Sequence, residues 1–109
     1  MVTVTFRRDS LNRLSSVFAD GHAGWADAGD DIVCAATSAI LQAAFLGLTA
    51  VAKIAVVSER TPGRLAIRWN ASERDRDDVR AIVETAELSI ESIAHDFPGH
   101  VRFERVNET

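Results

Sequence analysis

The sequence is short of cysteine, of positive charge and of repeated segments, and each shortage excludes a class of protein. Its single cysteine, Cys34, cannot form a disulfide within the chain, which suits a reducing compartment. Lys and Arg total 12 against 16 Asp and Glu, a formal net charge of −4 that gives no support to nucleic-acid binding. With 109 residues, 47% of them apolar, the chain is expected to form one folded domain over residues 1–109.

A secretory signal is also missing, because no basic stretch followed by an apolar stretch opens the chain. One membrane candidate remains. Between Ile32 and Val57 the only charged residue is Lys53, and that length could cross a bilayer. Cys34 and several hydroxyl and amide side chains interrupt the run, and no Lys/Arg cluster flanks it. We therefore expect a buried helix followed by a buried strand, and no membrane partner.

Hydrophobic patterns predict two β-hairpins and two helices in the order β-β-α-β-β-α-β. Turn-forming residues at 9–12 and at Thr61-Pro62-Gly63 close the two hairpins. The expected fold class is α+β, a single domain in which two helices pack on a largely antiparallel sheet. The predicted strands are 2–8, 13–20, 53–60, 64–70 and 100–106, and the predicted helices run from about 31 to 51 and from 72 to 97.

The same patterns predict which faces are buried. In the second strand, Leu14 and Phe18 should share one face, with Val17 and Ala19 on the other. The first helix is apolar on nearly every side, so the sheet, the second helix or a partner subunit should cover it. Gly47 within it indicates close packing or an early helix end. The second helix has one apolar stripe and a polar face formed by Arg76, Arg80, Glu84, Glu87 and Glu91.

The candidate chemistry lies between residues 21 and 38. A loop with glycines at 21, 24 and 29 holds His22, and Cys34 follows twelve residues later near a predicted helix start. If Asp31 caps that helix, Cys34 is its third residue, where the positive helix end would favour the thiolate. His22 would then act as its ion-pair partner or base. Asp31 and Ser38 lie at i−3 and i+4 from the cysteine, on the same helix face.

Plainer interpretations stand beside this one. A lone cysteine in an alanine-rich helix is usually a small buried hydrophobe, and Asp31 can be only a cap. A metal site built from His22, Asp27, Asp30, Asp31 and Cys34 does not match the paired spacing of zinc ligands, and we expect neither metal nor cofactor. The loop contains four aspartates and no basic residue between 20 and 31, which favours a cationic peptide or is simply a solvated cap region.

This stretch, Gly21-His22-Ala23-Gly24 with Gly29 and Asp31-Ile32-Val33-Cys34-Ala35-Ala36 and then Ser38, resembles the signature of the ribosomal-processing cysteine proteases of the Prp (YsxB-like) family. The resemblance implies a cytoplasmic, homodimeric endopeptidase that removes a short N-terminal extension from the large-subunit ribosomal protein numbered twenty-seven. The cut would follow two aromatic residues and precede basic sequence.

By the same resemblance, Cys34 is the nucleophile and His22 the general base, while Gly21, Asp31 and Ser38 shape and support the pair. The flexible loop of the family corresponds to residues 23–30, and Trp25 stands where smaller aromatic residues are common. Two alternatives stay open: a non-catalytic module that binds a basic ribosomal peptide, and a thiol acyl-enzyme with another substrate.

Overall fold

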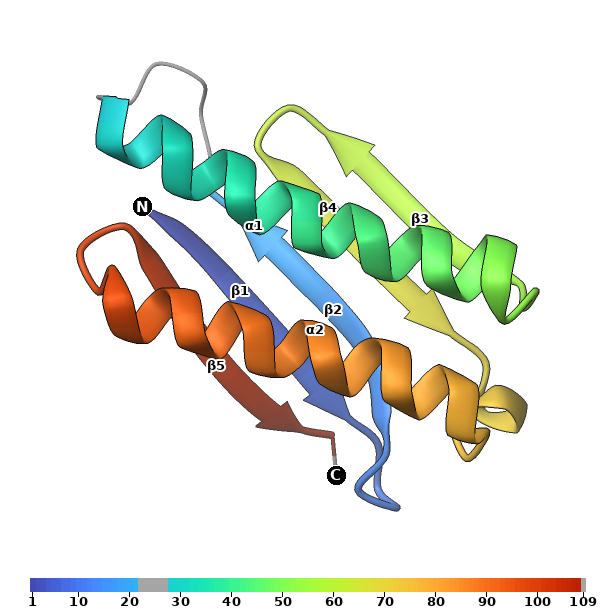
Figure 1. Ribbon diagram of the computed structural model, residues 1–109. Helices are drawn as coiled ribbons and strands as arrows, with labels where there is room; N and C mark the ends of the chain where they lie inside the picture. The colour runs from blue at the N-terminus through green and yellow to red at the C-terminus, as the bar shows by residue number, and fades with distance from the viewer. Residues whose placement is uncertain (22–27, 109) are drawn as a thin grey trace.

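The computed structural model of the chain is a two-layer α+β domain (Figure 1). It describes residues 1–21 and 28–108, with only the backbone described for residues 28–31. The predicted order β-β-α-β-β-α-β is confirmed. The elements are β1 (Val2–Arg8), β2 (Leu14–Asp20), α1 (Ala28–Leu46), the π-helical turn η1 (Gly47–Val51), β3 (Val56–Thr61), β4 (Arg64–Trp69), the 3₁₀ turn η2 (Ala71–Glu73), α2 (Asp77–Asp96) and β5 (Val101–Asn107).

The five strands form one sheet in the order β3-β4-β2-β1-β5. The pairs β1–β2, β2–β4 and β3–β4 are antiparallel, so the predicted largely antiparallel sheet is confirmed. Only β5 is parallel to its neighbour, β1, because α2 brings the chain back across the sheet before β5 begins. The strands β3 and β5 are therefore the two edges of the sheet.

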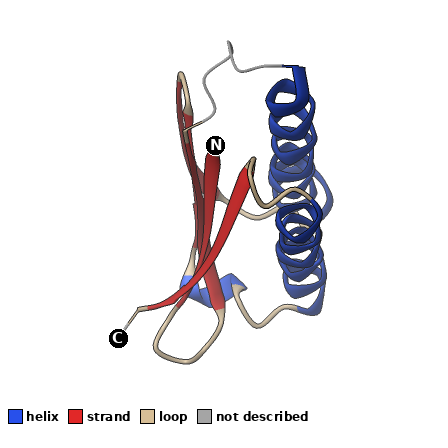
Figure 2. Ribbon diagram, turned by 90° about the vertical axis from the view of Figure 1, so that its left-hand side faces the viewer, coloured by secondary structure: helices blue, strands red, loops and turns tan. Residues whose placement is uncertain are grey.

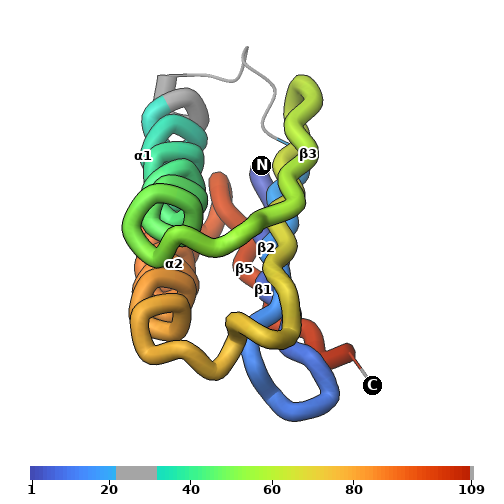
Figure 3. The backbone as a smooth tube through the Cα atoms, turned by 90° about the vertical axis from the view of Figure 1, so that its right-hand side faces the viewer, coloured from blue at the N-terminus to red at the C-terminus, as the bar shows by residue number. Residues whose placement is uncertain are grey.

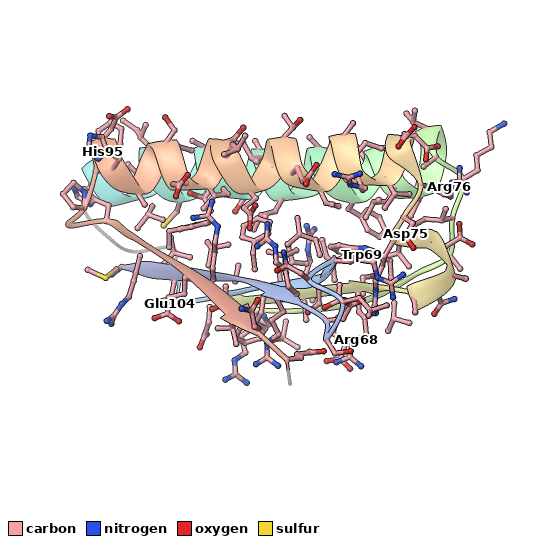
Figure 4. The ribbon with its side chains drawn as sticks, turned by 90° about the horizontal axis from the view of Figure 1, so that it is seen from below. Arg68, Trp69, Asp75, Arg76, His95 and Glu104 are labelled. Carbon is pink, nitrogen blue, oxygen red and sulfur yellow. The ribbon has the colours of Figure 1, made fainter. Side chains whose placement is uncertain are left out.

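Both helices pack on the same face of the sheet, and the other face has no helix over it (Figure 2). The core lies between the layers. Figure 4 shows Trp69 between sheet and helices, whereas Arg68, the preceding residue of β4, lies on the far side. The largest fully buried side chains are Trp69, Phe6, Leu41, Leu48, Ile67 and Ile90. The indole Nε1–H of Trp69 donates to the Leu14 carbonyl over 2.9 Å, so its one polar group is satisfied.

The predicted face of Leu14 is wrong, because a β-bulge intervenes. Arg7 pairs with Ser16 but Arg8 pairs with Leu14, so Ser15 is the extra residue. Past the bulge the alternation of side chains reverses. Leu14 is therefore buried in the same core as Val17 and Ala19, while Phe18 on the other face is half-buried.

The helix α1 begins earlier than predicted. Its helical backbone starts at Ala28, so neither Asp30 nor Asp31 occupies the cap position, and Cys34 is the seventh helical residue, not the third. Acidic residues are favourable throughout the first turn, where the unpaired amides lie, so their presence did not define the first residue. At the other end, the α-helix passes at Gly47 into the π-helical turn η1, which ends at Val51, the predicted end of the helix. Of the two alternatives for Gly47, close packing is confirmed, since a Cβ there would lie 3.0 Å from Ile82 of α2.

The apolar run from Ile32 to Val51 is long and hydrophobic enough to cross a membrane, judged by length and composition alone. Within the single chain only 28% of its apolar window is buried. Val33, Leu41 and Leu48 face the core, but Ile32, Leu46 and Val51 are 70%, 56% and 74% exposed. One face of α1 is thus uncovered by the sheet and α2.

The strand after it is not buried, contrary to prediction. β3 starts at Val56 because Lys53 adopts a positive φ of 57°, which breaks the extended backbone. Five of the six residues of β3 are exposed, since an edge strand has a neighbour on one side only.

The helix α2 begins at Asp77, after the short turn η2, and not at Ser72. Its polar face is also not wholly solvated. Glu87 is 3% exposed, and its two carboxylate oxygens accept hydrogen bonds from Arg8 at 2.6 and 2.8 Å, with a third from Arg105 at 3.2 Å. A carboxylate can be buried when it is paired in this way.

Candidate active site

Cys34 lies on the second turn of α1 and is half-buried against the edge of the core. A reactive cysteine needs some access to solvent, and a wholly buried one is inert. The half-buried position therefore fits a nucleophile better than it fits a filler of the core.

The position of Cys34 changes one part of the expected chemistry. The field of a helix N-terminus acts mainly within the first turn, and Cys34 is the seventh residue. The helix N-terminus therefore stabilises the Cys34 thiolate less than it would if Cys34 were the third helical residue, as predicted. Activation then depends more on a nearby base.

Ser38 is one helical turn beyond Cys34 and lines an open groove of about 490 Å³. One wall of the groove is α1, with Ser38 and Gln42, and the other is the β3–β4 hairpin from Arg60 to Leu65. The predicted common face of Cys34 and Ser38 thus runs into a concave surface that can hold a peptide segment.

The far wall is shaped by the predicted hairpin turn. Thr61 is the last residue of β3 and Arg64 the first of β4, so Pro62 and Gly63 form a two-residue turn. Gly63 has φ +78°, a conformation that suits glycine after proline in such turns. The turn lies at the same end of the molecule as the start of α1 (Figure 3).

Gly21 connects this turn to the histidine loop. Its N–H donates to the Gly63 carbonyl over 2.9 Å, and its φ is +102°. A Cβ at this position would lie 2.6 Å from the Met1 carbonyl oxygen, a distance that real Cβ atoms essentially never show. The residue before His22 is therefore held in one conformation, against both the hairpin turn and the start of the chain.

The structure brings three of the five predicted site residues to this end of the molecule: Gly21, Cys34 and Ser38. His22, with Trp25 and Asp27 of the same loop, lies outside the described residues, and for Asp31 only the helical backbone is described. Among the side chains described, no group of three His, Cys, Asp or Glu residues is placed to hold a metal ion.

Sequence reasoning missed the contribution of the β3–β4 hairpin to the groove. The Thr61-Pro62-Gly63 signal identified a turn, but its contact with Gly21 joins residues more than forty positions apart. Only the pairing of β2 with β4, from Ser16–Arg68 to Asp20–Arg64, brings them together.

Comparison with known proteins gives consistent results. The family model described as cysteine protease Prp matches residues 1–102. A ribosomal processing cysteine protease Prp of Staphylococcus aureus is 29% identical over 105 residues, covering 94% of this chain and 96% of that protein.

Solved structures show the same fold. SMU.848 from Streptococcus mutans superposes with a TM-score of 0.84 at 26% identity, over 99% of this chain and 96% of that one. The essential ribosomal processing protease Prp from S. aureus in complex with a substrate peptide gives 0.86 at 23% identity, over 96% and 99% of the two chains. Its complex with a covalently linked product peptide gives 0.84 at 24% identity, with the same coverage.

Cys34 is half-buried, Ser38 one helical turn beyond it lines a groove that can hold a peptide, and the family model matches residues 1–102. This chain belongs to the cysteine protease Prp family.

Proposed function

We propose that this cysteine protease removes a short N-terminal extension from the large-subunit ribosomal protein numbered twenty-seven, with Cys34 as nucleophile and His22 as general base. The S. aureus relatives are named ribosomal processing proteases, and one of their structures holds a substrate peptide. The observation that carries the proposal in this chain is the half-buried Cys34 on the helix face that continues, through Ser38, into the groove.

The proposed chemistry is acyl transfer. His22 accepts the thiol proton, and the Cys34 thiolate attacks the scissile carbonyl carbon. The C–N bond then breaks, the leaving amine takes the proton from the imidazolium, and a thioester remains. Water hydrolyses the thioester and frees the thiol. Backbone amides near the start of α1 are candidates to stabilise the oxyanion.

Gly21 supports this assignment of His22. The Gly21 N–H donates to the Gly63 carbonyl beside the groove, and Met1 closes the Cβ position of Gly21, so the backbone directly before His22 is fixed near the groove. A general base must come within hydrogen-bond reach of its proton when substrate is bound. Asp31 and Ser38 would support the pair.

The test is cleavage of a synthetic peptide that spans the extension and the mature start of the ribosomal protein, followed by mass spectrometry. Cys34→Ala should abolish cleavage and leave the fold intact, whereas Ser10→Ala, an exposed hydroxyl in the turn between β1 and β2, should cleave like the wild type. Activity retained by Cys34→Ala would refute the assignment.

Thiol alkylation separates the catalytic hypothesis from the alternative of a module that only binds a basic peptide. At about pH 6 an activated cysteine reacts much faster than a free thiol, because its thiolate fraction is higher. His22→Ala should bring the alkylation rate of Cys34 down to that of a free thiol. An equally slow rate in the wild type would favour the binding module.

We also propose that the protein is a homodimer in which a second copy covers the outer face of α1. No charged residue lies between Ile32 and Ala52, and the exposed Leu46 and Val51 belong to that stretch. A further groove of about 440 Å³, lined by Ile40, Gly47 and Ile82 among others, runs between α1 and α2 on this side. Exposed apolar surface of this extent is typical of an interface.

Sedimentation analysis tests the dimer. Leu46→Glu should dissociate it, because a charge would be buried in the interface, whereas Val57→Glu, on exposed strand β3, should leave it intact. A monomeric wild type at micromolar concentration, or a protein that pellets with lipid vesicles, would contradict the proposal.

We propose a cytoplasmic location, where thiols stay reduced and cell fractionation can detect the protein.

A further inference from the structure

The groove beside Ser38 extends the site along α1 beyond the thiol. Ser38 and Gln42 are one and two helical turns past Cys34, which is about 6 and 12 Å along the helix axis. Both line the groove, and Leu65 of β4 contributes an apolar side chain to it. A peptide that lies in this groove in an extended conformation therefore continues past Cys34.

The sheet register shows which side chain of β3 points toward this groove. Arg60 pairs with Leu65, and Ser58 pairs with Ile67, which is buried in the core beneath the helices. Side chains alternate along a strand, so Arg60 lies on the helix-covered face with Leu65. Arg68 lies on the opposite face (Figure 4).

Arg60 is the cation of this groove that has no carboxylate partner among the described residues. Arg64, the other arginine of the lining, is 3.4 Å from Asp20 and stacks over the Phe18 ring at 5.8 Å. These contacts hold Arg64 on the outer face of the sheet. An exposed guanidinium at the rim of an apolar groove is a ready donor for a carboxylate.

We propose that Arg60 is a specificity-determining residue that binds an acidic side chain of the substrate on the amino-terminal side of the cleaved bond. This inference rests on the proposed protease site at Cys34. The groove runs along α1 about 6 to 12 Å from Cys34 and an extended peptide advances about 3.3 Å per residue, so the acidic residue would lie about two to four positions from the bond. The segment after the bond is basic in the proposed substrate and would be repelled by Arg60.

The experiment measures kcat/KM for peptides in which Asp or Asn occupies, one at a time, the second to the sixth position before the cleaved bond. The wild type should prefer Asp about two- to fivefold at one or two of these positions, as expected for a partly exposed ion pair. About 0.5 M salt should reduce the preference, because added ions screen exposed charges.

Arg60→Gln should lose the preference, so that the Asp and Asn peptides of each pair are cleaved with equal kcat/KM. The matched control is Arg68→Gln, which removes the same charge from the adjacent strand but on the opposite face, and it should keep the preference. A wild type with no Asp preference at any position, or an Arg60→Gln variant that retains it, would overturn the inference.

The outcome is separable from that of the proposed function. If the wild type cleaves none of the peptides, the proposed function fails. The role of Arg60 is then tested separately, by measuring with fluorescence anisotropy how tightly Cys34→Ala binds the same labelled peptides. In that assay tighter binding of Asp peptides, lost in Cys34→Ala/Arg60→Gln, supports the carboxylate site. Equal binding of Asp and Asn peptides by both proteins refutes it.

Discussion

Replacing Gly21 by alanine perturbs the point from which the histidine loop begins. Gly21 directly follows β2, has φ +102° and donates its N–H to the Gly63 carbonyl across 2.9 Å. A Cβ would lie 2.6 Å from the Met1 carbonyl oxygen, which belongs to the backbone just before the neighbouring strand β1 and cannot rotate away as a side chain could. Alanine therefore needs both an unfavourable backbone dihedral and a shift of the start of β1 or of the end of β2.

The two costs can be added. A non-glycine residue in a sparsely populated φ region loses about 1–3 kcal/mol. Relief of a contact as tight as that with Met1 adds about 1–3 kcal/mol, as for overpacking in a core. The reduced freedom of the unfolded chain returns about 0.4–1 kcal/mol. The net loss is about 1–6 kcal/mol with a midpoint of about 3 kcal/mol, and at roughly 4 °C per kcal/mol for a domain of this size the midpoint lowers the melting temperature by about 12 °C.

Thermal unfolding, followed by circular dichroism, measures the loss of stability. Peptide cleavage, at a temperature where the variant is folded, measures the effect on activity. We expect kcat/KM to fall because the Gly21–Gly63 hydrogen bond must lengthen. Gly99→Ala is the matched control, since a Cβ there meets nothing within 4 Å. A Gly21→Ala protein as stable as Gly99→Ala would refute the steric reasoning, and one that is destabilised but fully active would refute the link to the site.

Three further predictions concern the scaffold. Glu87→Gln should lower the free energy of unfolding by about 2–3 kcal/mol, because Arg8, only 19% exposed, loses its charged partner. The control Glu91→Gln should lower it much less, and equal urea midpoints of the two variants would contradict this. Partial burial works to raise the pKa of Asp9, but hydrogen bonds from the Arg13 amide and the Arg74 side chain outweigh it and lower that pKa from 3.8 to about 2. The wild type should thus lose stability between about pH 4 and pH 2 more steeply than Asp9→Asn, whereas parallel pH profiles would exclude the effect. Thr37→Val should stabilise the fold by about 1 kcal/mol, because the buried Thr37 hydroxyl has no hydrogen-bond partner among the described residues; a lower melting temperature would show that the hydroxyl is used.

Local patterns were sufficient for most of the elements. Alternation identified the strands around Val4 and Ile67, steps of three and four identified α2, and Pro62-Gly63 identified its turn. Apart from the starts of the two helices, the errors occurred where long-range contacts decide. The bulge at Ser15 reversed the face of Leu14, and the pairing of Glu87 with Arg8 allowed a charge on the polar face of α2 to be buried.

For the site, the sequence by itself determined the residue types and their local spacing: one thiol, one loop imidazole, and Ser38 one turn beyond Cys34. A helix repeats every 3.6 residues, so that last relation holds wherever the helix starts. Only the tertiary structure decided that Cys34 is half-buried on the second turn, that Gly21 is held by Gly63 and Met1, and that Arg60 lines the groove. Those relations depend on strand order and register, which place residues distant in sequence side by side and which local propensity does not encode.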